Sequence, residues 1–266
     1  MFQTIDHVGK FTLDLHRYFK DILVFVYLSF RSTTQLRIRN FRPIVFTLMS
    51  QIYFTGYQAL PLVTFIALAT GSIIVLQSTA QLSILGSQEM MGNILVVTII
   101  RELGPLLTAF TVIARSGTAV ATELGSMQVN KEIEALRTMS IDPLGFVVFP
   151  RIVGGVMSLV CLAFYFNCIA LIGGFFVSNF VSDLSFSFYL EVLSQALTQE
   201  DFFLNIFKNA LSGFIIFSIS SYHGLMVKEA PHEIPIATTK AVVNSIMAVV
   251  AFNLSISVYL FSRALQ

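Results

Sequence analysis

The chain has 266 residues, of which 55% are apolar and only 12% are charged, and its mean hydropathy is +0.79. A soluble globular domain usually has about 25% charged residues, so the composition excludes an ordinary water-soluble enzyme. Sixteen Lys and Arg against fifteen Asp and Glu give a net charge of +1, which provides no general basicity for binding nucleic acid. We therefore predict an all-α integral membrane protein.

The first 42 residues are predicted to form an N-terminal cytoplasmic or interfacial segment, followed by a transmembrane domain over residues 43–266. Residues 11–30 begin as an amphipathic helix, and their uninterrupted apolar run, residues 22–30, is too short to cross a hydrocarbon core of about 30 Å. Arg17, Lys20 and Arg31 flank it. This pattern is typical of a helix that lies in the membrane interface.

Five apolar runs are long enough to cross a bilayer. Seven Lys and Arg precede the first run, four lie in the loop 115–151, and two lie in the loop 228–240. Because positive charge stays on the cytoplasmic side, the N-terminus and the loop 115–151 are predicted inside and the C-terminus outside. The predicted spans are residues 59–82, 93–114, 152–180, 202–227 and 241–261.

The two predicted outer loops, residues 83–92 and 181–201, contain acidic residues and no Lys or Arg. The second of them also has apolar residues at helical spacing, which predicts a short amphipathic helix on the outer membrane face. The acids are Glu89, Asp183, Glu191, Glu200 and Asp201, and the apolar positions are Phe186, Phe188, Tyr189, Leu193 and Leu197.

Three ionisable residues, Arg101, Glu102 and Lys208, fall inside predicted spans, where each costs roughly 2.5 to 3.5 kcal/mol at the bilayer centre. Arg101 and Glu102 are adjacent and so point about 100° apart on a helix. Pro105 has no amide hydrogen for the Arg101 carbonyl, so a kink and a free acceptor are expected there. The three residues either line a substrate cavity or form a structural ion pair.

The predicted cytoplasmic loop contains a second short amphipathic helix, residues 129–139. Val129, Ile133, Leu136 and Met139 share one face, and Asp142-Pro143 ends the segment. Such a helix suits docking into a groove of another protein, and the alternative is a helix that lies on the lipid surface. The remaining faces carry Lys131, Glu132, Glu134 and Arg137.

A series of short motifs along residues 40–262 resembles the MlaE/YrbE family of ABC-transporter permeases, and the order of the spans also matches. The motifs are Arg101-Glu102-Leu103-Gly104-Pro105, Ala114-Arg115-Ser116-Gly117, Glu123-Leu124-Gly125-Ser126-Met127, Glu132-Ile133-Glu134-Ala135-Leu136, Met139, Asp142-Pro143, Pro150-Arg151 and Ala237-Thr238-Thr239-Lys240-Ala241-Val242-Val243.

The resemblance implies a homodimeric permease in the bacterial inner membrane that works with a cytoplasmic ABC ATPase and a periplasmic MCE-domain protein. Such systems move phospholipid between the inner and outer membranes, which affects outer-membrane lipid asymmetry, and some have a small cytoplasmic accessory protein. The family places polar residues near its lipid cavity at Arg101, Glu102 and Lys208. Its coupling helix for the ATPase falls on Val129, Glu132, Ile133, Glu134, Leu136 and Met139.

Catalytic and metal-binding motifs are absent from the sequence. It has no phosphate-binding Gly-x4-Gly-Lys-Ser/Thr run, no His-Glu-x-x-His or Cys-x-x-Cys, and no Gly-x-Ser-x-Gly. The chain is thus expected to be a non-catalytic subunit without cofactor, with ATP and magnesium bound by a separate ATPase. Two alternatives are an ion-coupled secondary transporter with Glu102 as its proton site, and a passive scaffold for an outer MCE protein.

Overall fold

The computed structural model describes residues 17–18, 20–32, 41–85, 90–180, 185–228 and 230–264, and these are almost entirely helical. Five helical stretches within them are long and apolar enough to cross a membrane, which confirms the prediction of an all-α protein with five spans. The stretches are Arg42–Gln81, Met91–Val129, Leu144–Val177, Gln199–Leu225 and Glu233–Arg263.

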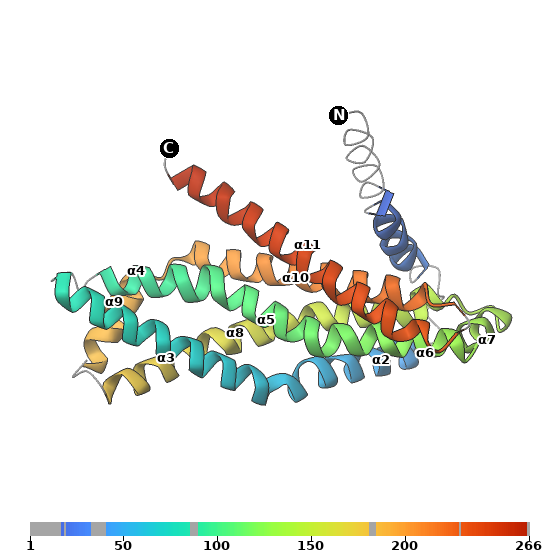
Figure 1. Cartoon of the computed structure of the whole chain (residues 1–266), viewed down its shortest axis with the longest axis horizontal. Coiled ribbons are helices and arrows are strands. Elements are labelled where there is room, and N and C mark those ends of the chain that lie inside the picture. The colour runs from blue at the N-terminus through green and yellow to red at the C-terminus, as the bar shows by residue number, and fades with distance from the viewer. Residues whose placement is uncertain are drawn as a thin grey trace.

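The spans form an elongated bundle with α7 at one end and α4 and α9 at the other (Figure 1). The first two spans are interrupted by 3-10 or π-helical segments rather than by loops. In chain order, the elements are α2 (Phe41–Thr55), η2 (Tyr57–Ala59), α3 (Leu60–Leu85), α4 (Met91–Leu95), η4 (Val96–Leu103), α5 (Gly104–Val112), η5 (Ile113–Gly117), α6 (Thr118–Val129), α7 (Glu132–Thr138), η6 (Leu144–Val148), α8 (Phe149–Asn179), α9 (Phe186–Ala196), α10 (Gln199–Leu225) and α11 (Glu233–Ala264).

The prediction that residues 115–151 form a loop is mostly wrong, because the second span continues as helix to Val129. Its glycines pack closely instead of ending the helix: a Cβ at Gly117 would lie 3.1 Å from the Ser220 hydroxyl, and one at Gly125 would lie 3.1 Å from a Val227 methyl carbon. At 39 residues the stretch is about 58 Å long, so it extends well beyond a hydrocarbon core of about 30 Å.

The short helix of this region is α7, and it spans Glu132–Thr138 rather than the predicted residues 129–139. Lys131 and Ser140 bracket it with φ of 60° and 61°, a left-handed conformation that interrupts a helix. Val129 is therefore the last residue of α6, and Met139 is the C-cap of α7.

The core lies along α8, which packs against α2, α3 and α10. Close approach of these helices depends on glycine: a Cβ added at Gly71 in α3 would lie 2.0 Å from the Ala170 carbonyl oxygen of α8. Nearer the N-terminus of α8, a Cβ at Gly155 would lie 2.2 Å from the Phe217 ring of α10. Small residues at such positions let helices pack at short distance within a membrane.

The amphipathic helix predicted in the second outer loop is confirmed as α9, although Leu197 is its C-cap rather than a helical residue. The helix packs on the bundle through the buried side chains of Tyr189, Val192 and Leu193. The Tyr189 hydroxyl donates to the Leu171 carbonyl at 3.0 Å. Burial raises the pKa of Tyr189, so the phenol stays neutral and remains a donor.

The described part of the N-terminal helix, residues 20–32, packs against α10 through Ile22 and Val26, which form a small cluster with Ile219. Just before it, the Tyr18 hydroxyl lies 2.9 Å from His223 Nε2 and accepts from the Asn244 amide at 2.9 Å. Burial raises the pKa of Tyr18. Residues 11–16 and 19 of the predicted interfacial helix lie outside the described residues, and its place in the interface stays a prediction.

Candidate functional site

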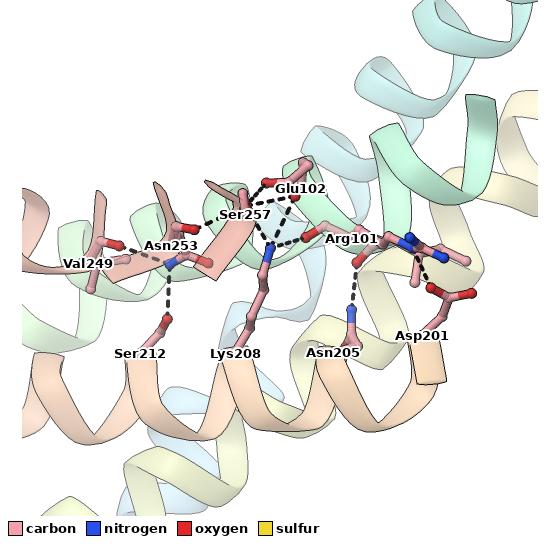
Figure 2. Close-up of polar contacts among 10 residues, drawn as sticks. Arg101, Glu102, Asp201, Asn205, Lys208, Ser212, Val249, Asn253 and Ser257 are labelled. Carbon is pink, nitrogen blue, oxygen red and sulfur yellow. Dashed lines mark hydrogen bonds and ion pairs between the residues drawn. The ribbon is translucent and has the colours of Figure 1, made fainter. Parts of the chain in front are cut away.

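A stripe of buried polar residues follows one face of α10. Its members recur at helical spacings of four, three, one and three residues, which place them on a single face. Each is 2% exposed or less. In Figure 2, Asp201, Asn205 and Lys208 point toward η4 of the second span, whereas Ser212 points toward Asn253 of α11. The residues are Asp201, Asn205, Lys208, Asn209 and Ser212.

Lys208 is the centre of this cluster and is 1% exposed. Its ammonium donates to the Arg101 carbonyl at 2.8 Å, to Glu102 Oε1 at 3.2 Å and to the Ser257 hydroxyl of α11 at 3.1 Å. An ammonium has three N–H groups, so each has an acceptor. Ser257 in turn lies 2.8 Å and 2.7 Å from the two oxygens of the Glu102 carboxylate.

The structure confirms the free carbonyl that Pro105 predicts and also explains the π-helical turn. The Gly104 amide donates to Ile99, five residues back, and Pro105 has no amide hydrogen. The carbonyls of Ile100 and Arg101 thus lose their usual α-helical donors. Side chains of α10 replace them: the Asn205 amide donates to the Ile100 carbonyl at 2.8 Å, and Lys208 donates to that of Arg101 at 2.8 Å.

This geometry predicts coupling between Asn205 and Pro105. Asn205→Leu leaves the buried Ile100 carbonyl without its donor, which is expected to cost about 1 to 3 kcal/mol. In a Pro105→Ala background, the new amide at position 105 lies five residues after Ile100 and supplies a π-helical donor. The loss in apparent melting temperature caused by Asn205→Leu should therefore be clearly smaller in that background, as measured by heating the purified variants and quantifying folded protein. Equal losses in both backgrounds would contradict this account of the π-helical turn.

Arg101 points away from Lys208, as its position next to Glu102 predicts. Its Nε bonds to the carboxylate of Asp201 at the start of α10. Asp201 also accepts from the Thr198 amide at 3.0 Å and from the Thr198 hydroxyl at 2.7 Å, which completes a capping box. Arg101 therefore ties η4 to the N-terminus of α10.

The structure thus brings Glu102 and Lys208 together, whereas the Arg101 side chain pairs elsewhere. Asp201, which the sequence analysis assigned to an outer loop, is buried, because its carboxylate caps α10 and pairs with Arg101. The polar spacing within the fourth span was a signal that could have identified Asp201 and Asn205. No pattern in the sequence identified Ser257 as a member of the cluster, because only the packing of α11 brings it to Glu102.

One side of the cluster is accessible. The side chains of Arg101 and Glu102 are each 35% exposed, while those of Lys208 and Asp201 are 1% exposed. The C-terminal part of α11 diverges from the bundle (Figure 1) and carries the exposed apolar residues Leu254 and Val258 beside Ser257. One cation and one carboxylate, Arg101 and Glu102, are therefore accessible beside an apolar surface, a combination that suits a molecule with both polar and apolar parts.

The α7 end carries the residues predicted to couple to an ATPase. Glu132, Glu134 and Met139 are exposed, whereas Leu136 is half-buried and Ile133 is 2% exposed. The helix is thus amphipathic as predicted, and Ile133 faces the bundle instead of the surface. No group of three or more His, Cys, Asp or Glu side chains that would hold a metal is found in the described parts of the chain.

These features define a multi-pass α-helical membrane protein with a hydrogen-bonded charge cluster at the depth of its spans, an arrangement typical of transport proteins. The family model for Permease MlaE matches residues 48–259, and the chain belongs to this family.

The chain is also similar to several named proteins. It is 32% identical to a probable ABC transporter permease protein of Rickettsia bellii, over 82% of this chain and 85% of the relative. It is 26% identical to the intermembrane phospholipid transport system permease protein MlaE of Haemophilus influenzae, over 80% and 82%. It is also 26% identical to the chloroplastic protein TRIGALACTOSYLDIACYLGLYCEROL 1 of Arabidopsis thaliana, over 81% and 62%.

Proposed function

We propose that this chain is the permease subunit of an ATP-driven transporter that moves phospholipid between the inner and outer membranes, and that it resides in the inner membrane. The Lys208 cluster is the observation that carries the proposal, because a charged site with an apolar border suits a lipid. The printed name of the Haemophilus influenzae relative, a phospholipid transport system permease, supports the same substrate class.

In this proposal the lipid headgroup contacts the exposed parts of Arg101 and Glu102, and its acyl chains lie along α11. Lys208, on the buried side of the cluster, holds the Glu102 carboxylate in position. Two copies of the chain, packed through the exposed apolar face of α11, enclose the lipid between them. The exposed residues Leu254, Val258, Tyr259 and Phe261 on α11 give this face side chains that can pack against a second copy, since packing contacts drive helix association within a membrane.

The energy is proposed to come from a separate ATPase that docks on α7. The exposed acids of α7 give it a polar surface for a partner, and the buried Ile133 anchors it to the bundle. ATP binding to that partner would then favour one arrangement of the second and third spans over another, as differential affinity requires. A periplasmic MCE-domain protein, and in some systems a small cytoplasmic accessory protein, complete the proposed assembly.

The geometry argues against Glu102 as a proton carrier in an ion-coupled transporter. Protonation of Glu102 would leave the ammonium of Lys208, which is 1% exposed, without its carboxylate. Leaving one member of a buried ion pair unpaired typically costs about 3 to 5 kcal/mol. Protonation of Glu102 in every transport cycle would therefore be energetically unfavourable.

The proposal is tested by isolating the tagged chain from its native membranes in mild detergent and identifying bound proteins and lipids by mass spectrometry. We expect an ABC ATPase, an MCE-domain protein and a stoichiometric phospholipid. Recovery of the chain without an ATPase would reject the ATP-driven class and favour an ion-coupled transporter. Recovery of the MCE-domain protein without ATPase or lipid would favour a passive scaffold.

A further inference from the structure

A cavity of about 460 Å³ lies between α2, α6 and α8, at the α7 half of the bundle and away from the Lys208 cluster. Its walls combine polar and charged side chains with two phenylalanines, Phe46 and Phe54. No step of the proposed transport mechanism uses it. The polar residues are Thr47, Ser50, Gln51, Glu123 and Arg151, and Ala119 forms part of the α6 wall.

The cavity carries one charge of each sign. Arg151 is 6% exposed, and its Nη2 donates to Glu123 Oε1 at 2.7 Å, while its Nη1 donates to the Val147 carbonyl at 3.3 Å. The only further contact of the guanidinium in the described residues is Met127 Sδ at 4.0 Å from Nη2, so two of its five N–H groups have no acceptor there. Glu123 keeps 59% of its side chain exposed.

The cavity lies at headgroup depth. Arg151 precedes Val177, the end of the third span, by 26 positions, which is about 39 Å along a helix. A bilayer is about 30 Å thick across its hydrocarbon core and about 40 to 45 Å with its headgroups. With Val177 at one surface, Arg151 falls in the headgroup layer of the opposite leaflet, which is the cytoplasmic leaflet in the predicted orientation.

The surface around the cavity suits a lipid more than a soluble molecule. Phe46 at its edge is 76% exposed, and the neighbouring α2 residues Val45 and Met49 are also exposed. These side chains offer an apolar path for acyl chains beside a polar pocket. The unused N–H groups of Arg151 and the exposed side chain of Glu123 match a headgroup that carries both a phosphate and an amine.

We propose that this cavity binds the phosphoethanolamine-type headgroup of an inner-leaflet phospholipid, with the phosphate on Arg151 and the ammonium on Glu123. The site is distinct from the Lys208 cluster, and the inference does not depend on the transport function proposed above. It would give the chain a second lipid contact, on the predicted cytoplasmic side.

Photolabelling of the full-length chain tests the site. The chain is placed in phosphatidylcholine nanodiscs that contain phosphatidylethanolamine with a photoactivatable acyl chain, and the labelled peptides are mapped by mass spectrometry. We expect labelling of residues 45–49, along which the acyl chains are proposed to lie. Ala119→Phe fills the cavity without changing a charge and should lower that labelling about tenfold. Ala114→Phe, at an exposed position of the same span, is the matched control and should leave it unchanged.

A second variant tests headgroup recognition. Glu123→Gln keeps the size of the side chain and removes its charge, so the preference for phosphatidylethanolamine over phosphatidylglycerol should fall about tenfold. A purely structural Glu123–Arg151 pair predicts no change in lipid preference, and that result would overturn the proposal. Labelling that is insensitive to Ala119→Phe would also overturn it, as would complete displacement by free phosphoethanolamine, since the ligand would then be soluble.

Discussion

Glu102→Lys is expected to abolish lipid transport and to destabilise the chain severely. The substitution removes the carboxylate that pairs with Lys208, whose side chain is 1% exposed, and places a second cation beside it. Leaving the buried ammonium of Lys208 unpaired in this way costs about 3 to 5 kcal/mol, which corresponds to a fall of about 6 to 20 °C in apparent melting temperature for a chain of this size. The measurements are the folded fraction of detergent-solubilised chain after heating, and lipid transport in cells that carry the variant.

The matched control is Glu191→Lys, the same change at an exposed position of α9. It should alter the melting temperature by less than about 2 °C, since surface substitutions typically change stability by no more than about 0.5 kcal/mol. The exchange of both residues, Glu102→Lys with Lys208→Glu, restores opposite charges and should recover part of the stability. Equal losses for Glu102→Lys and Glu191→Lys would show that Glu102 does not lie in a buried ion pair.

Glu134→Arg should abolish association with the ATPase while membrane insertion stays intact. Glu134 is exposed on α7, so reversing its charge is expected to act mainly on the docking surface. Juxtaposed like charges at an interface cost several kcal/mol, and each 1.4 kcal/mol is a tenfold change in affinity. Co-purification of the ATPase should therefore fall by at least about tenfold.

Two further variants make the α7 experiment specific. Glu191→Arg introduces the same charge change at the opposite end of the bundle and should leave ATPase recovery unchanged. Leu136→Arg is expected to abolish association as well, but Leu136 packs against the core, so this variant should also lower the melting temperature. Normal recovery of the ATPase with Glu134→Arg would remove α7 from the proposed coupling role.

The ATPase is proposed to dock on α7 and the lipid to bind near Lys208. One helical stretch connects these two sites. Met91–Val129 contains both η4, which carries Arg101 and Glu102, and α6, whose end leads into α7. Glu123 of α6 is also bonded to Arg151 at the start of the third span. A push on α7 would thus act on the second and third spans together.

The number of spans, the charges at membrane depth and the amphipathic character of α7 and α9 could all be predicted from the sequence. Each of these depends on local properties: the length of an apolar run, the position of a charge within it, or the spacing of apolar residues along a few helical turns. The free carbonyl of Arg101 belongs to the same group, because the missing amide of Pro105 is a covalent property of the chain.

How those elements contact one another depends on the packing of the whole bundle and could not be predicted from the sequence. The offset between the second and fourth spans brings Lys208 to Glu102 and Asp201 to Arg101, and the packing of α11 adds Ser257. The continuation of helix through residues 118–129 also depends on tertiary contacts, because Gly117 and Gly125 become packing positions only when α10 and α11 lie against them. The relative shift and rotation of helices are set by side chains far apart in the sequence, and no local pattern contains that information.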